Sequence, residues 1–223
     1  MLFDLHVHTR ISPCSSLDPN DILTHARSRG LDGVCITDHD TMDIKNFCLE
    51  GLQQDGLCII FGMEYSTSEG DFLIFGPFEE VPLGLSAKEI LTEVNEAGGV
   101  AIAAHPCRKV RPTRKYVIRE GYCRIIEGIN GRNQEHENQM AFSLYQNYPV
   151  SFVGGSDSHT LEELGSVATR IGGKIQTRLD LIKALKGGNF SFRIRSRVNF
   201  LRSEQALQSH CYQRNHFASS AIK

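Results

Sequence analysis

Short apolar runs alternate with helical patterns along most of the chain, and this alternation is its main structural signal. Each run is aliphatic or aromatic at successive positions, as expected of strands that are buried on both faces of a sheet. The pattern predicts strands in MLFDLHVH, DGVCITDHD, LCIIFG (57–62), DFLIFG (71–76), VAIAA (100–104), RIIEGI (124–129) and SFVGG (151–155), followed by SVATRI and FSFRIR.

The segments between these runs carry helix start and stop signals. Asp18 is placed to cap a helix that has Pro19 at its first position and ends near Gly30. Ser86 and Glu89 have the spacing of a capping box at the start of SAKEILTEVNEAGG. Further helices are expected over residues 44–54, in QEHENQMAFSLYQNY (134–148) and over residues 177–187.

Strands that alternate with helices of this length predict βα units and an α/β fold built on a parallel sheet. About seven or eight such units favour a closed or nearly closed barrel over an open three-layer sheet. No linker divides the chain, so we expect residues 1–202 to form one barrel domain. The periodicity is lost from Ser203 onward, and residues 203–223 are expected to form a polar tail.

Composition narrows the functional classes only slightly. The net charge of −2 does not favour nucleic-acid binding over the whole surface. No apolar stretch is long enough to span a bilayer, and the N-terminus lacks the pattern of a signal peptide. Seven cysteines without a C-x-x-C pair are typical of reduced thiols rather than of a disulfide framework. We therefore expect a cytoplasmic protein with no membrane partner.

Side chains that bind metal ions recur where the predicted strands end. The carboxyl ends of barrel strands meet on one face, and residues i and i+2 of an extended segment point the same way. A single His-x-His or SDSH is more often packing or a turn, but the joint placement predicts a polynuclear metal site. Imidazoles with carboxylates suit zinc, manganese or iron better than calcium. The strand-end residues are His6 and His8, Asp38 and His39, Glu64, His105, Glu127 and Asn130, and Asp157 and His159.

The motifs DLHVHT, ITDHD, GMEYS, AAHP and GSDSH, in this order, resemble those of the PHP (polymerase and histidinol phosphatase) superfamily. The resemblance extends over about residues 1–190 and is strongest to small stand-alone metal-dependent phosphoesterases. It implies a distorted (β/α)7 TIM-like barrel, with two or three divalent ions at the carboxyl ends of the strands. It also implies hydrolysis of phosphate esters.

The resemblance further implies a set of metal ligands. One ion would be held by His6, His8, Glu64 and Asp157, a second by Glu64 and His105, and a third by His39 and His159. The second ion needs another ligand, for which Glu127, Asn130 and Asn133 are the candidates. Cys14 stands where the third ion's remaining ligand is expected, and the alternative is that its thiol packs in the loop.

The expected nucleophile is water activated by the metal ions. The residues expected to take part in catalysis are Glu64, Asp38 and His159. Asp38 is expected to bind metal or to orient His39. Arg108 follows the His105 strand and Arg132 follows the next one, and guanidinium groups bind phosphate oxygens in pairs. These two arginines are the predicted substrate-binding residues.

The predicted activity is phosphoester hydrolysis of a nucleotide or a similar small phosphorylated metabolite. The alternatives are an exonuclease that trims short oligonucleotides, a histidinol-phosphate phosphatase, and a non-catalytic metal-stabilised module. A complete ligand set disfavours the last of these. Neither G-x-G-x-x-G nor a P-loop follows a strand, which disfavours a kinase or a dehydrogenase.

Overall fold

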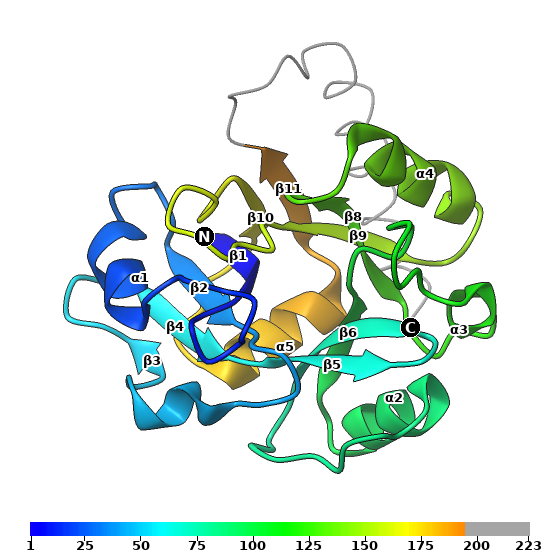
Figure 1. Cartoon of the computed structure of the whole chain (residues 1–223), viewed down its shortest axis with the longest axis horizontal. Helices are drawn as coiled ribbons and strands as arrows, with labels where there is room; N and C mark the ends of the chain where they lie inside the picture. The colour runs from blue at the N-terminus through cyan, green and yellow to red at the C-terminus, as the bar shows by residue number, and fades with distance from the viewer. Residues whose placement is uncertain (195–223) are drawn as a thin grey trace.

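The strands divide into two mixed sheets in the computed structural model, which describes residues 1–194 (Figure 1). The six-stranded sheet has the order β11-β10-β1-β2-β4-β3 and the five-stranded sheet the order β5-β6-β7-β8-β9. The predicted polar tail at 203–223 lies outside the described residues. The strands are β1 (Leu2–Val7), β2 (Gly33–Ile36), β3 (Gly51–Leu52), β4 (Cys58–Phe61), β5 (Met63–Thr67), β6 (Gly70–Phe75), β7 (Val100–Ala103), β8 (Ile125–Asn130), β9 (Ser151–Gly155), β10 (Val167–Ile171) and β11 (Phe190–Ile194).

Among the described residues, the two sheets meet at isolated bridges rather than in one closed ladder. Val7 at the end of β1 bridges Ser158 beyond β9, and His39 beyond β2 bridges Glu64 in β5. Both bridges are parallel and lie at the ends of the sheets where polar residues gather. The α/β class is confirmed, whereas the closed (β/α)7 barrel is not: the structure shows two abutting sheets.

Strand direction departs from the all-parallel expectation. β1, β2 and β4 are parallel, as are β7, β8 and β9, but β5–β6, β6–β7, β1–β10 and β10–β11 are antiparallel. The linker explains the β5–β6 pairing, since a two-residue turn between these strands allows only a hairpin. Glu64, which was expected to follow a strand, therefore lies inside β5.

Helices lie around the outside of the strands, as α1 to α4 show in Figure 1. The predicted caps are present: Asp18 accepts from Asn20 N, and Ser86 and Glu89 form a reciprocal capping box. The prediction of a helix over residues 44–54 is wrong, because this segment forms a short 3₁₀ turn followed by β3. The helices are α1 (Pro19–His25), η1 (Asp43–Asn46), α2 (Ala87–Glu96), α3 (Lys115–Arg119), α4 (Glu135–Tyr145) and α5 (Arg178–Gly187).

The core is apolar on both sides of the sheets, and it leaves the polar strand ends at one edge. Among the described residues, no helix is both long and apolar enough to cross a bilayer. β1, β7 and β9 end just before His8, His105 and Asp157, whose side chains are all buried. The fold therefore brings segments from both sheets to a single buried polar cluster.

Candidate metal centre

Glu64 is the residue around which the polar cluster is arranged. Its Oε2 lies 3.1 Å from Nε2 of His8, 3.1 Å from Nδ1 of His39 and 3.3 Å from Nε2 of His6. Its Oε1 lies 2.8 Å from Nε2 of His105. One carboxylate thus contacts four imidazoles, supplied by β1, the end of β2 and the end of β7.

The ligand atoms form three overlapping groups that could each hold an ion. In each group, all the ligand atoms lie within 4.8 Å of one another. The Nε2 atoms of His6 and His8 are 3.0 Å apart, and both face Oδ1 of Asp157, at 3.5 and 3.3 Å. The groups are His6, His8 and Asp157; His8, His39 and His159; and Glu64, Asp71 and His105.

Buried charges perturb the pKa values across this cluster. Burial favours the neutral ring of His6, but the carboxylates of Asp157, Glu127 and Glu64 outweigh burial and raise its pKa well above the usual value. Burial also opposes ionisation of Asp157, yet His6 and then a hydrogen bond from His8 hold its pKa far below its ordinary range. Carboxylates that remain ionised beside imidazole nitrogens are a donor set that fits a divalent cation.

His159 is set up to present one ring nitrogen. Its Nδ1 donates to the backbone oxygen of Asp157 at 2.8 Å, which leaves Nε2 without the proton in the neutral ring. Burial and the nearby His8 lower the pKa of His159 to about 4, so this ring is neutral at physiological pH. A neutral imidazole with a fixed tautomer is the form that binds metal ions.

Backbone strain is concentrated at the same place. The non-glycine residues with positive φ in the described chain are Asp40 (φ 56°), His105 (φ 30°), Arg111 (φ 63°) and Asp157 (φ 54°). Each such residue costs on the order of 1–3 kcal/mol and persists only where the surroundings enforce it. All four belong to, or adjoin, the segments that carry the cluster, so the strained backbone coincides with the polar edge of the sheets.

Glu127, in β8, contacts the cluster through hydrogen bonds from both of its carboxylate oxygens. Its Oε1 accepts from Nδ1 of His6 at 3.0 Å, and its Oε2 accepts from the backbone N of His105 at 2.8 Å and from Nδ2 of Asn130 at 2.9 Å. Oδ1 of Asn133 accepts from Nε of Arg108 at 2.9 Å. The three candidates for the second ion's missing ligand are thus engaged with protein groups.

Asp38 holds the turn after β1. Its carboxylate accepts from the N and Oγ1 of Thr9, both at 2.7 Å, and from Oγ of Ser12 at 2.6 Å. Oγ of Ser12 in turn accepts from the backbone N of His39 at 3.0 Å. Asp38 is fully buried and outside the three ligand groups, so its geometry is that of a residue that positions His39.

The two predicted substrate arginines differ in their surroundings. Nη2 of Arg108 donates to Oδ2 of Asp157 at 2.6 Å and to Oδ1 of Asn130 at 2.8 Å, so this guanidinium is fixed beside the cluster. Arg132 is exposed, and its Nε lies 3.7 Å from Oε1 of Glu163. Arg132 is therefore the freer of the two.

For two further residues, Cys14 and Asp71, the three ligand groups differ from the predicted ligand set. Cys14 is exposed and belongs to none of the three groups, so its metal role stays a prediction. Asp71 was not expected at the site, yet it joins Glu64 and His105. Its signal in the sequence was weak, because it stands at the start of an apolar run and not at its end.

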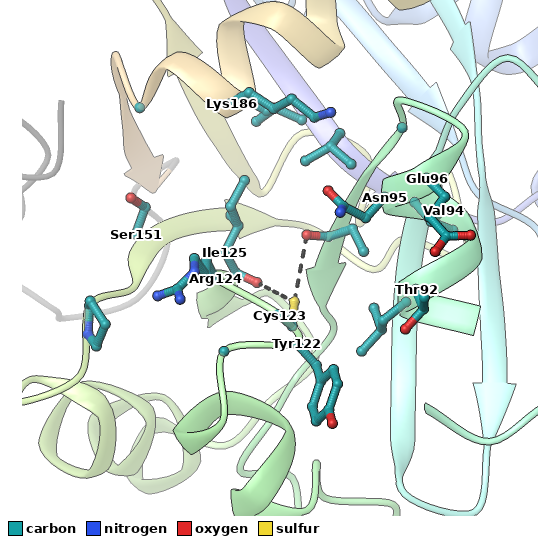
Figure 2. Close-up of a pocket in the computed structure, with 18 of the residues that line it drawn as sticks. Thr92, Val94, Asn95, Glu96, Tyr122, Cys123, Arg124, Ile125, Ser151 and Lys186 are labelled. Carbon is teal, nitrogen blue, oxygen red and sulfur yellow. Dashed lines mark hydrogen bonds between the residues drawn. The ribbon is translucent and has the colours of Figure 1, made fainter. Parts of the chain in front are cut away.

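A cavity of about 1040 Å³ lies at the opposite ends of the strands (Figure 2). It is lined by residues at the amino ends of β7, β8 and β9, such as Val100, Ile125 and Ser151. Its one thiol, Cys123, donates to the backbone oxygens of Ala101 and Ile125, and burial raises its pKa to about 11. No ligand group lies there among the described residues, so the metal centre and the cavity are separate features.

Comparisons with known proteins agree with this geometry. The PHP-associated family model matches residues 135–190. The uncharacterized protein MJ1587 of Methanocaldococcus jannaschii is 36% identical over 118 residues, which cover 48% of this chain and 68% of that protein. The uncharacterized protein MJ0417 of the same organism is 29% identical over 174 residues, covering 74% and 68%.

Solved structures share the fold at low identity. PsfC from Pseudomonas syringae superposes with a TM-score of 0.70 at 17% identity, over 99% of this chain and 98% of PsfC. A two-domain protein from Bacteroides vulgatus, containing a predicted PHP-like metal-dependent phosphoesterase, gives 0.67 at 18%, over 87% and 64%. Endonuclease Q, in complex with a 27-mer duplex with an abasic lesion, gives 0.63 at 20%, over 84% and 57%. The PHP-associated model and the PHP-like structural neighbour agree with the resemblance to the PHP superfamily that the motifs indicate.

Proposed function

We propose that this chain is a metal-dependent phosphoesterase that hydrolyses a phosphate ester of a nucleotide or a similar small phosphorylated metabolite. The observation that carries the proposal is the contact of Glu64 with four imidazoles, beside the buried carboxylate of Asp157. The resemblance to the PHP superfamily supports the same reaction class.

The residues fit two or three divalent ions such as zinc, manganese or iron. Glu64 would be shared between ions, because its two oxygens face different imidazoles. When bound, such ions acidify water and neutralise phosphate charge. The proposed ligands are His6, His8, Glu64 and Asp157 for one ion, Glu64 and His105 for the second, and His39 and His159, with Cys14 as a further candidate, for the third.

The chain's own residues then orient these ligands and bind the substrate. Glu127 holds His6, and Asp38 holds the turn that contacts His39. Arg132, whose exposed guanidinium forms only a long ion pair with Glu163, is the proposed phosphate-binding residue, and Arg108, already fixed on Asp157, adds positive charge at the same edge. Charge-assisted bonds to phosphate are worth about 1.5–3 kcal/mol each.

A nuclease acting on short nucleic acids is the second candidate. The fold likeness to Endonuclease Q, solved with a DNA duplex, favours it. It is ranked second because a net charge of −2 does not favour the binding of an extended polyanion.

The test is a phosphate-release screen of the chelated protein reloaded with Mn²⁺, Zn²⁺ or Fe²⁺. Substrates are nucleoside monophosphates and bisphosphates, histidinol phosphate and short oligonucleotides, the last also followed by gel. We expect turnover of a nucleotide, abolished by chelation and by Glu64→Gln but retained in the exposed control Glu93→Gln. Turnover of oligonucleotides alone would select the nuclease, and turnover unaffected by chelation would refute both candidates.

A further inference from the structure

The second ion, held by Glu64 and His105, has one protein ligand too few when only the predicted residues are counted. Catalytic metal sites commonly use three protein side chains and keep another position for water or substrate. Glu64 and His105 supply two, in contact at 2.8 Å. The remaining candidates, Glu127, Asn130 and Asn133, have side-chain oxygens that accept hydrogen bonds from protein donors.

Asp71 stands on the strand beside Glu64, on the same face of the sheet. In the β5–β6 hairpin, Glu64 pairs with Leu73 and Ser66 pairs with Asp71. Alternate residues of a strand share a face, so Asp71 and Leu73 both lie on the side of Glu64. Asp71 is only 3% exposed, and its carboxylate joins Glu64 and His105 in a group whose ligand atoms lie within 4.8 Å of one another.

The backbone fixes the third member of this group. Ala104 N donates to the backbone oxygen of Asp71 at 2.9 Å, so the end of β7 is in register with the start of β6. His105 follows directly, with φ 30°, and its Nδ1 is buried without a hydrogen-bond partner among the described residues. Paired strands, not a flexible loop, therefore set the distances between the three donors.

Arg111 reaches Asp71 from the exposed side. Its Nε donates to Oδ2 at 2.8 Å and its Nη2 donates to Oδ1, which makes the pair bidentate. The Arg111 side chain is half exposed, whereas Asp71 is buried. Each carboxylate oxygen has two acceptor positions, so a contact with arginine leaves one position on each oxygen for a second partner.

We propose that Asp71 is the third protein ligand of the ion held by Glu64 and His105, with Arg111 as the charge partner of its carboxylate. This assignment rests on the proposed metal-dependent function. It gives the second ion two carboxylates and one imidazole, supplied by β5, β6 and the end of β7. The competing role for Asp71 is structural: it would only anchor Arg111, and neither side chain would influence metal binding.

Two single variants separate these roles. Asp71→Asn removes the charged ligand, and Arg111→Gln removes the ion pair but keeps the carboxylate. Each protein is stripped by chelation, dialysed and titrated with Mn²⁺, with free Mn²⁺ measured by electron paramagnetic resonance and bound metal by elemental analysis. We expect Asp71→Asn to lose one ion per chain, or to bind it at least about tenfold more weakly. Arg111→Gln should bind as tightly as the wild type or more tightly.

The double variant Asp71→Asn/Arg111→Gln covers the case in which an unpaired guanidinium prevents folding. It should show the metal loss of Asp71→Asn while keeping the wild-type circular dichroism spectrum. Equal number and affinity of ions in wild type, Asp71→Asn and the double variant would overturn the assignment and leave the proposed function intact. If the wild type, reloaded in turn with Mn²⁺, Zn²⁺ and Fe²⁺, binds none of them, the proposed function itself fails.

Discussion

Glu127 determines which nitrogen of His6 faces the candidate metal centre. A carboxylate only accepts hydrogen bonds, so the 3.0 Å contact places a proton on Nδ1 of His6 and makes Nε2 the nitrogen directed at Glu64 and Asp157. The other oxygen of Glu127 accepts from the backbone N of His105, so one side chain positions two proposed ligands. Sequence alone could not distinguish this role from that of a ligand.

Replacing Glu127 with Gln should weaken metal binding while leaving the fold intact. An amide presents an NH₂ group to one of two positions that now accept hydrogen bonds, so either His6 or His105 loses its partner. We expect metal affinity to fall about 10- to 100-fold, measured by competition with a chromophoric chelator. Glu137→Gln is the matched control, because Glu137 accepts from Lys109 N and Gln134 N and contacts no proposed ligand. Equal affinities in the two variants would contradict the positioning role.

Cys14 provides a second test at this scale. If its thiolate binds a metal, saturating Zn²⁺ should slow its alkylation by iodoacetamide, because a metal-bound thiolate is a weaker nucleophile; we expect this protection. Peptide mapping by mass spectrometry gives the rate at Cys14. Cys107 and Cys123 serve as controls, since burial raises the pKa of each thiol to about 11 and should keep both unreactive. An unchanged rate at Cys14 would assign its thiol to the loop alone.

At the scale of elements, the end of β9 passes close to His6 and Glu127. A Cβ on Gly155 would lie 2.6 Å from Oε1 of Glu127 and 2.6 Å from Cβ of His6. β9 pairs with β8 through Asn130 and Gly155, so the strand cannot shift without disturbing that pairing. The absence of a side chain at this position is what allows β1, β8 and β9 to meet at the metal centre.

Gly155→Ala should therefore displace His6 and reduce both stability and metal loading. Overpacking of this kind costs typically about 1–3 kcal/mol, measured by urea unfolding with metal content determined in parallel. The control is Gly187→Ala at the end of α5, where no atom lies within 4 Å of the new Cβ. It should stabilise the helix by roughly 0.5–1 kcal/mol. Normal metal loading in Gly155→Ala would show that the strand end tolerates the methyl group.

At the scale of the whole molecule, the candidate metal centre draws its residues from both sheets. The six-stranded sheet supplies His6, and His8 and His39 follow its strands β1 and β2. The five-stranded sheet supplies Glu64, and His105 follows its strand β7. The sheets are also joined by isolated bridges and by Thr169 of β10, whose Oγ1 donates to the oxygen of Gly154 in β9 at 2.7 Å, so an ion held by both sides would add to these cross-links.

Removal of metal should therefore lower the thermal stability of the whole domain. A ligand that binds only the folded state at 100 times its Kd stabilises that state by about 2.7 kcal/mol, or roughly 5–10 °C in Tm for a chain of this size. Calorimetry of chelated and Mn²⁺-reloaded protein measures the difference. Glu64→Gln should abolish most of the shift, while Glu93→Gln should retain it. Identical melting with and without metal would argue against a cross-linking ion.

The sequence by itself determined where the ligands stand along the chain. Apolar runs that end in His and Asp predicted the ends of β1, β2, β7 and β9, and local caps such as Ser86 with Glu89 predicted helix starts, because these signals depend on near neighbours. The motifs also carried the superfamily resemblance, which the comparisons confirm.

Only the tertiary structure decided which of those side chains contact one another. The position of Glu64 within β5, the approach of Asp71 from β6 and the engagement of Glu127 with His6 all depend on pairing between strands. Strand register over long sequence separations sets which face a side chain occupies, and a shift of one residue reverses it. That register is a property of the assembled sheets, so the pattern of apolar and polar residues along the chain could not reveal it.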